Sequence, residues 1–208
     1  MDAIDERVCL NGLNMKAGDH IRPGYIYIVI LLILIIVNTL LARFAIITGA
    51  IGPGVAKFYF AVPFMIVFTL WFGAWGAVAA YLGCFIGAGM LGAMPFNVNL
   101  YWSLADVWQV VVPLLAFREL RANVGLKTRK DLIVFLLFGW VLNNLVGAGW
   151  GSISLAIGEL ASWRDVPVLF ASWFSTNLLV TLVIAPLTLR YATPFILKSG
   201  LYIQKYWR

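Results

Sequence analysis

The sequence predicts an all-α, polytopic membrane protein with six transmembrane helices and with both its N- and C-termini in the cytoplasm. Of its 208 residues, 62% are hydrophobic and 12% are charged, and the mean hydropathy is +0.93. A soluble domain carries about 25% charged residues, so most of the outer surface of this chain must face lipid. One membrane-crossing helix needs about 20 apolar residues. The length therefore accommodates six spans and leaves no room for a soluble catalytic domain.

Three regions are expected along the chain: a cytoplasmic N-terminal segment (residues 1–24), a six-helix membrane domain (25–189) and a basic-aromatic C-terminal tail (190–208). The N-terminal segment mixes acidic and basic residues without an apolar core, so it is not a cleaved secretory signal. The tail alternates Tyr, Phe and Trp with Lys and Arg, a composition that suits the headgroup layer. We expect the tail to lie along the inner membrane surface.

Breaks in the apolar pattern divide the membrane domain into its spans. The first span opens with an almost uninterrupted run of Ile, Leu and Val, and Gly52-Pro53-Gly54 separates it from the second. An uncharged turn at 72–76 leads into the third span, and a polar, aromatic loop at 95–102 precedes the fourth. A basic loop at 118–130 and a mixed-charge loop follow the fourth and fifth spans. The predicted spans are residues 25–47, 55–71, 77–94, 103–117, 131–157 and 168–189.

The distribution of Lys and Arg supports this layout. With the N-terminus inside, only Arg43, Lys57 and Arg164 fall in outer segments, so 12 of the 15 basic residues lie on the cytoplasmic side. Such a bias is the positive-inside rule, and a five- or seven-span count would spoil it. The net charge of +6 is then explained by a cytoplasmic face that meets anionic lipid, and no nucleic-acid partner is expected.

Polar groups inside the spans are candidate binding residues, because each is costly in lipid unless it is paired. Asp106 is the only acid placed well inside a span, and Gln109 shares its helix face at i+3. The fifth span adds Asn143 and Asn144. The sixth span adds Asn177, with Trp173 one turn before it. At a rise of about 1.5 Å per residue, these groups fall in the outer half or at the middle of the membrane.

Two interpretations of these polar residues are open. In the first, they line an intramembrane cavity that is open to the outside and binds a small molecule between polar groups and Trp rings. In the second, hydrogen bonds between helices only lock the bundle, and Asp106 pairs with Arg43 near the outer end of the first span. We expect no catalysis, because the spans offer a single carboxylate and the sequence has no G-x-S-x-G, H-E-x-x-H or phosphate-loop motif.

No metal site and no cofactor are expected either. The one histidine, His20, lies outside the predicted spans, and the spacing of Cys9 and Cys84 suits neither a disulfide framework nor a thiolate metal site. Small residues have a different role. Gly83 with Gly87, and Gly147 with Gly151, have the small-xxx-small spacing that allows helices to pack closely, within one bundle or in a homodimer.

Two family resemblances follow from these residues. Trp173-Phe-Ser-Thr-Asn177, followed after nine residues by Pro186, resembles the closing helix of the first membrane-associated sensor domain family of prokaryotic signalling proteins. The fourth span, from Asp106 to Arg118, is similar to the helix of that family in which an acid is followed by a terminal arginine. This resemblance implies a sensory module in the plasma (inner) membrane that signals through a separate partner protein.

The overall format also resembles the substrate-binding S components of energy-coupling factor uptake transporters. These are six-span proteins of about this length that capture vitamins from the outer side, and the resemblance implies a transport partner. Both resemblances imply non-covalent capture of a small ligand, but they differ in whether a signal or the ligand itself is passed on. A third interpretation is a structural subunit of a membrane complex.

Overall fold

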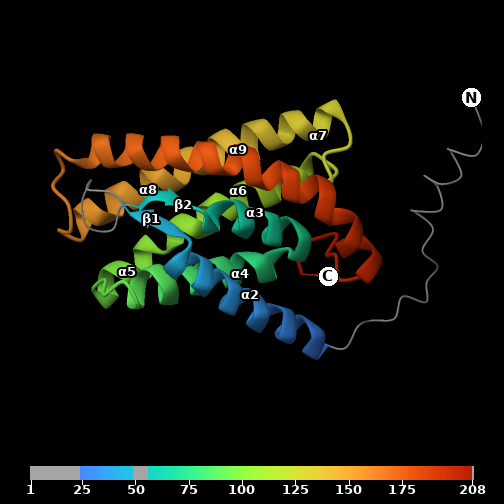
Figure 1. Cartoon of the computed structure of the whole chain (residues 1–208), viewed down its shortest axis with the longest axis horizontal. Helices are drawn as coiled ribbons and strands as arrows, with labels where there is room; N and C mark the ends of the chain where they lie inside the picture. Colours follow the sequence, from blue (N-terminus) through green and yellow to red (C-terminus); the bar gives the residue numbers. More distant parts are fainter. Residues whose placement is uncertain (1–23, 49–55, 208) are drawn as a thin grey trace, which may run out of the picture.

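Successive helices run back and forth along one long axis in the computed structural model, which describes residues 24–48 and 56–207 (Figure 1). Apart from one short hairpin, the described chain is helical. The helices are α2 (Gly24–Phe44), α3 (Ala61–Phe72), α4 (Ala74–Cys84), α5 (Phe96–Trp102), α6 (Leu104–Glu119), α7 (Arg129–Val134), α8 (Asn143–Ile157) and α9 (Val166–Ser199). The π-helical segments η1 (Phe85–Met90) and η2 (Phe135–Leu142) continue α4 and α7, and the strands are β1 (Ile46–Thr48) and β2 (Ala56–Tyr59).

Joined in series, these elements form helical segments of alternating direction: α2, α3, α4–η1, α5–α6, α7–η2–α8 and α9. The start of α2, the loop 120–128 and the C-terminal end lie at one end of the bundle, which we call the basic end. The β-hairpin, α5 and the loop 158–165 lie at the opposite end, which we call the hairpin end (Figure 1).

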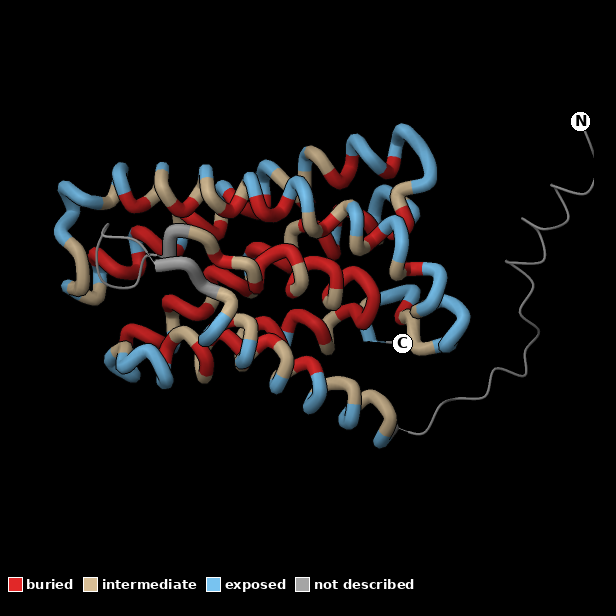
Figure 2. Tube along the Cα trace, in the orientation of Figure 1, coloured by how far each residue is buried: buried red, intermediate tan, exposed pale blue. Residues whose placement is uncertain are grey.

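Four of the segments are long and apolar enough to cross a bilayer: Tyr25–Phe44, Phe96–Glu119, Arg129–Ile157 and Val166–Ser199. The other two, α3 and α4–η1, are apolar but shorter. With 12 residues, α3 extends about 18 Å, against a hydrocarbon thickness of about 30 Å. Its residues are nearly all buried, and Figure 2 shows it enclosed within the bundle. The packing of α3 against other helices therefore compensates for its length.

Large apolar side chains cover the outer surface of the bundle. On α2, Ile36 is 59% exposed and Phe44 is 72% exposed; on α9, Leu179 is 60% exposed and Phe195 is 71% exposed. Soluble monomers rarely expose apolar surface of this extent, whereas a protein surrounded by lipid can expose it without an unfavourable contact with water. The architecture is that of an α-helical membrane protein, as the sequence predicts.

Three boundaries differ from the prediction. The end of the first predicted span and the start of the second form the antiparallel pair β1–β2. In this pair Ile46 lies opposite Tyr59, and the register shifts between Ile47 and Thr48. The predicted loop 95–102 contains helix α5, which reaches α6 after a single residue, Ser103. The last helix was expected to end at Leu189, and it continues to Ser199.

Some predicted features lie outside the described residues. They are residues 1–23 of the N-terminal segment, including Cys9 and His20, and the Gly52-Pro53-Gly54 break. Cys84 is described and is a free, buried thiol.

The C-terminal segment (residues 200–207) folds back onto the basic end of the bundle. Gly200, with φ of 67°, ends α9 in the left-handed conformation that glycine adopts most readily. The Ile203 amide then donates to the carbonyl of Trp71 at 2.9 Å, and the Ala74 amide donates to the carbonyl of Tyr206 at 2.6 Å. Ile203 is 1% exposed. These contacts dock the segment on the turn between α3 and α4.

Arg118, in the last turn of α6, fixes this docked segment. Its guanidinium donates to the hydroxyl of Tyr202 at 2.6 Å, to the carbonyl of Ile203 at 2.6 Å and to the carbonyl of Lys205 at 3.0 Å. A fourth bond, of 3.0 Å, reaches the carbonyl of Leu70 in α3. One side chain of α6 therefore holds α3 and the C-terminal segment together at the basic end.

Candidate functional site

The polar residues predicted on the fourth span lie on one buried face of α6. Asp106 and Gln109 are each 1% exposed, and Trp102 before them and Pro113 after them are also buried. The spacing of three to four residues keeps them on one helix face, which is turned into the bundle because α3, α4 and α8 pack against α6.

Asp106 has a different partner from the one considered in the sequence analysis. Its carboxylate accepts a hydrogen bond from the hydroxyl of Tyr59, on β2, at 3.1 Å. The Arg43 side chain is exposed and lies over the ring of Phe44. No ion pair joins Arg43 to Asp106 in the described part of the chain, so that pairing is wrong. Tyr59 belonged to an expected span, and only the fold of the hairpin brings its hydroxyl to α6.

An amide chain connects α6 to α8. The Nε2 of Gln109 donates to Oδ1 of Asn144 at 3.1 Å, and Nδ2 of Asn144 donates to the carbonyl of Trp140, in η2, at 2.7 Å. Asn143 and Asn144 are both 0% exposed. The interhelical lock considered in the sequence analysis therefore exists for the pair Gln109 and Asn144.

Glycines on α8 make room for the large side chains of its neighbours. A Cβ on Gly147 would lie 2.2 Å from Cγ of Gln109, and a Cβ on Gly151 would lie 2.5 Å from the ring of Trp173. These two glycines thus accommodate side chains, not a second backbone. Gly83 and Gly87 face α2 directly: a Cβ on Gly83 would lie 3.0 Å from a backbone carbon of α2, and one on Gly87 would lie 2.5 Å from a backbone oxygen.

The contact between Gly151 and Trp173 fixes the register of α8 against α9. The two helices are connected by a short loop and run in opposite directions (Figure 1), so one turn forward along α9 corresponds to one turn back along α8. Asn177 therefore lies at the level of Gly147, which contacts Gln109. One turn further on, Thr181 lies at the level of Asn143. Both Asn177 and Thr181 are 0% exposed.

Two tryptophans form the part of this polar region that faces the hairpin end. The rings of Trp102 and Trp173 lie with their centroids 5.9 Å apart and their planes at 42°. They belong to a small apolar cluster with Leu155 and Leu169. The cluster excludes water from that side, which raises the cost of any polar atom left without a partner.

Several polar atoms of the layer make no hydrogen bond to any described residue. They are Nε1 of Trp102, Oε1 of Gln109, both amide atoms of Asn143, both amide atoms of Asn177 and the hydroxyl of Thr181. A buried polar group without a partner costs about 1–3 kcal/mol, and native proteins contain few of them. The atoms without a partner are therefore concentrated where α5, α6, α8 and α9 meet. We call this set, together with Asp106, Asn144 and Trp173, the amide layer.

The part of the chain that the structure describes holds no group of three or more His, Cys, Asp or Glu side chains suited to a metal ion. Sequence reasoning found the carboxamides of the amide layer because amides are rare in apolar runs. It missed the bond from Tyr59 to Asp106 and the contacts of Arg118, because these partners are distant in the sequence and no sequence motif connects them.

Comparison of the chain with protein-family models, with curated proteins and with solved structures finds no match.

Proposed function

We propose that this chain is a six-span plasma-membrane protein, with both termini in the cytoplasm, that binds a small polar molecule in the amide layer and signals the binding event to a separate partner protein. The observation that carries the proposal is the pair Asn143 and Asn177. Both side chains are fully buried, and neither amide has a hydrogen-bond partner among the described residues.

The topology is supported by the arrangement of the helical segments and charges. Six segments alternate in direction, and the start of α2 lies at the same end as the C-terminal segment (Figure 1). The loop 120–128 and the first turn of α7, which carry four basic residues, are at this basic end. Arg43 and Arg164 belong to the hairpin end. The positive-inside rule then assigns the basic end to the cytoplasm.

The chemistry of the amide layer indicates the type of ligand. A carboxamide offers both donors and acceptors, and the tryptophans offer flat apolar surface with one indole N–H each. The described layer contains one carboxylate, Asp106, which already accepts from Tyr59. A small molecule with several hydrogen-bonding groups and a planar or apolar part would satisfy these side chains.

Helix α6 provides a route from the amide layer to the basic end. Gln109 contributes to the layer and Arg118, nine residues later, holds the C-terminal segment. Pro113 lies between them and has no N–H to donate to the carbonyl of Gln109, which weakens the helix at that point. A ligand that displaced Gln109 would bend α6 at Pro113 and alter the hydrogen bonds that Arg118 makes to the C-terminal segment. This coupling favours signalling over a purely structural role.

Mass spectrometry of small molecules that co-purify with the full-length protein tests the binding step. We expect a polar compound with wild type that is lost from the variant Asn177→Leu. Asn38→Leu is the matched control, because Asn38 on α2 is equally buried and unpartnered, and it should retain the compound. Absence of any compound, together with higher thermal stability of Asn177→Leu, would instead favour the structural subunit, since replacing an unpartnered polar group with an apolar one stabilises a fold.

Two further measurements separate the remaining alternatives. ATP-dependent accumulation of the identified compound in vesicles would assign the uptake function and contradict signalling. For the topology, a membrane-impermeant maleimide applied to intact cells should label Arg164→Cys and leave Lys130→Cys unlabelled. The opposite pattern would refute the proposed orientation.

A further inference from the structure

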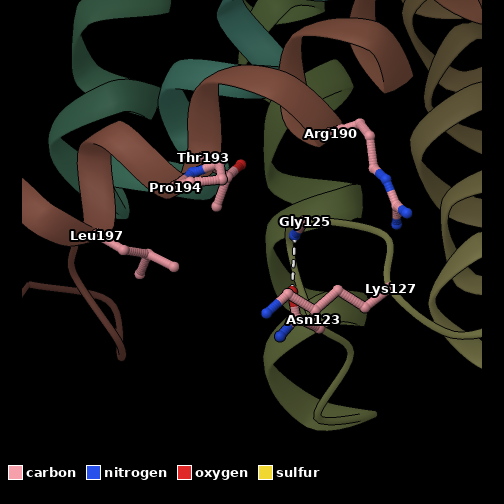
Figure 3. Close-up of a pocket in the computed structure, with 7 residues that line it drawn as sticks. All are labelled: Asn123, Gly125, Lys127, Arg190, Thr193, Pro194 and Leu197. Atoms are coloured by element: carbon pink, nitrogen blue, oxygen red, sulfur yellow. Dashed lines mark hydrogen bonds between the residues drawn. The ribbon is translucent and has the colours of Figure 1, made fainter.

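A pocket of about 450 Å³ opens at the basic end, between the loop 120–128 and the last turns of α9 (Figure 3). The loop side is formed by Asn123, Gly125 and Lys127, and α9 contributes Arg190, Thr193, Pro194 and Leu197. Gly125 brings the two sides together: a Cβ on it would lie 3.9 Å from Cγ2 of Thr193. The pocket is remote from the amide layer, so the inference drawn from it does not depend on ligand binding there and rests only on the proposed topology.

The loop side of the pocket is held in place by Asp131. Its carboxylate accepts from the amides of Asn123 at 2.7 Å and Thr128 at 2.8 Å, and Thr128 in return caps the start of α7. The amide of Gly125 donates to Oδ1 of Asn123 at 2.8 Å. Asp131 is 3% exposed and is saturated by these donors. Asp131 thus holds the loop in shape and is not one of the residues that line the pocket.

The side chains that line the pocket are rich in donors and contain no carboxylate. Lys127 makes no side-chain hydrogen bond or ion pair within the described chain. Arg190 uses one nitrogen, Nη1, to donate to the carbonyl of Leu126 at 3.0 Å, which leaves its other N–H groups available. Thr193, 1% exposed, accepts from Nε1 of Trp71 at 2.9 Å through its hydroxyl oxygen, and its Cγ2 methyl faces Gly125.

An ammonium and a guanidinium on one pocket are suited to a phosphate group, which accepts several charge-assisted hydrogen bonds. The position and the apolar side chains indicate where that phosphate comes from. With 34 residues, α9 is about 51 Å long, whereas the hydrocarbon core measures about 30 Å. Arg190 lies about 36 Å from the start of α9, so in the proposed topology the pocket lies at headgroup level. Pro194 and Leu197 would contact the glycerol and the first methylenes of a lipid.

From this geometry we infer that the pocket between the loop 120–128 and α9 is a binding site for a phosphate group, with Lys127 and Arg190 as its donors. The headgroup of an anionic phospholipid and a soluble phosphate share this chemistry. The experiment distinguishes these two sources.

The test is an equilibrium titration of the purified full-length protein in neutral detergent, read by native mass spectrometry and by thermal unfolding. The probes are dihexanoyl phosphatidylglycerol, dihexanoyl phosphatidylcholine and inorganic phosphate. Lys127→Gln is the principal variant, because the lysine has no partner whose loss would disturb the fold. Arg164→Gln is the matched control, since it removes one exposed cation at the hairpin end.

We expect wild type and Arg164→Gln to bind phosphatidylglycerol equally, and Lys127→Gln to bind it about fivefold more weakly, the usual contribution of one cation at an anionic membrane surface. Phosphatidylcholine, with no net charge, should bind more weakly to all three. If Lys127→Gln binds inorganic phosphate more weakly than wild type and Arg164→Gln do, and the lipid shows no such difference, the site is supported and its ligand is a soluble phosphate. Equal affinity of Lys127→Gln and Arg164→Gln for every probe would overturn the inference.

Discussion

Replacing Arg118 with methionine should undock the C-terminal segment while leaving the helices assembled. The side chain makes three hydrogen bonds to that segment, through Tyr202, Ile203 and Lys205. A hydrogen bond to a charged group contributes about 1.5–3 kcal/mol, but Arg118 is only partly buried, so we assign about 1 kcal/mol to each. The docking free energy should therefore fall by about 3 kcal/mol. Since 1.4 kcal/mol corresponds to a factor of ten, the segment should open about 100-fold more often.

Hydrogen–deuterium exchange measures this opening directly. The Ile203 amide is protected by its bond to Trp71, and its exchange should accelerate about 100-fold in Arg118→Met. Arg118→Lys keeps the charge but lacks the planar guanidinium, so its Ile203 amide should exchange at a rate between those of wild type and Arg118→Met. Lys130→Met is the control for loss of one cation at the same end. Unchanged protection of residues 200–207 in Arg118→Met would refute the idea that this arginine holds the segment.

Two further substitutions test contacts within the bundle by thermal unfolding in detergent. Tyr59→Phe removes the hydrogen-bond donor to Asp106 and should lower the free energy of unfolding by about 1–3 kcal/mol. Its control, Tyr25→Phe at an exposed position, should leave the stability unchanged. Equal melting temperatures of the two variants would show that the hydrogen bond to Asp106 contributes no stability. Gly83→Ala forces a methyl group against α2 and should destabilise by about 1–3 kcal/mol. Gly149→Ala is its control, because the nearest atom to the added carbon lies 4.0 Å away. A similar loss of stability in both variants would contradict a close approach of α2 at Gly83.

Composition and periodic breaks in hydropathy were sufficient to predict the helical class and the approximate position of most helices. The predicted fifth span, for example, begins at Asp131, and the structure has helix from Arg129 to Ile157. The strength of this signal is physical: lipid selects apolar runs of helix length, so the boundaries appear in the sequence itself. Asn143, Asn144 and Asn177 were identifiable for the same reason, as costly exceptions within such runs.

Features that depend on long-range contacts could not be predicted in this way. The strand residues Ile46–Thr48 and Ala56–Tyr59 contain one charged residue, Lys57, and directly adjoin apolar helices, so only their pairing identifies them as strands. The extension of α9 past Leu189 was hidden because its last turns carry the mixed basic and aromatic residues of a surface segment. The partners of Arg118 are 48 to 87 residues away in sequence, and no spacing rule connects them.

The shortness of α3 has a consequence for how the chain reaches its place in the bilayer. An isolated apolar stretch of 12 residues is below the length that partitions stably across a membrane by itself. If α3 crosses the bilayer as proposed, it must enter together with α4, as a pair joined at Gly73, or after its neighbours have formed a receptive surface. Biogenesis would then not proceed as independent insertion of each helix followed by association. A truncated chain that ended soon after Phe72 and had been released from the ribosome should leave α3 outside the lipid.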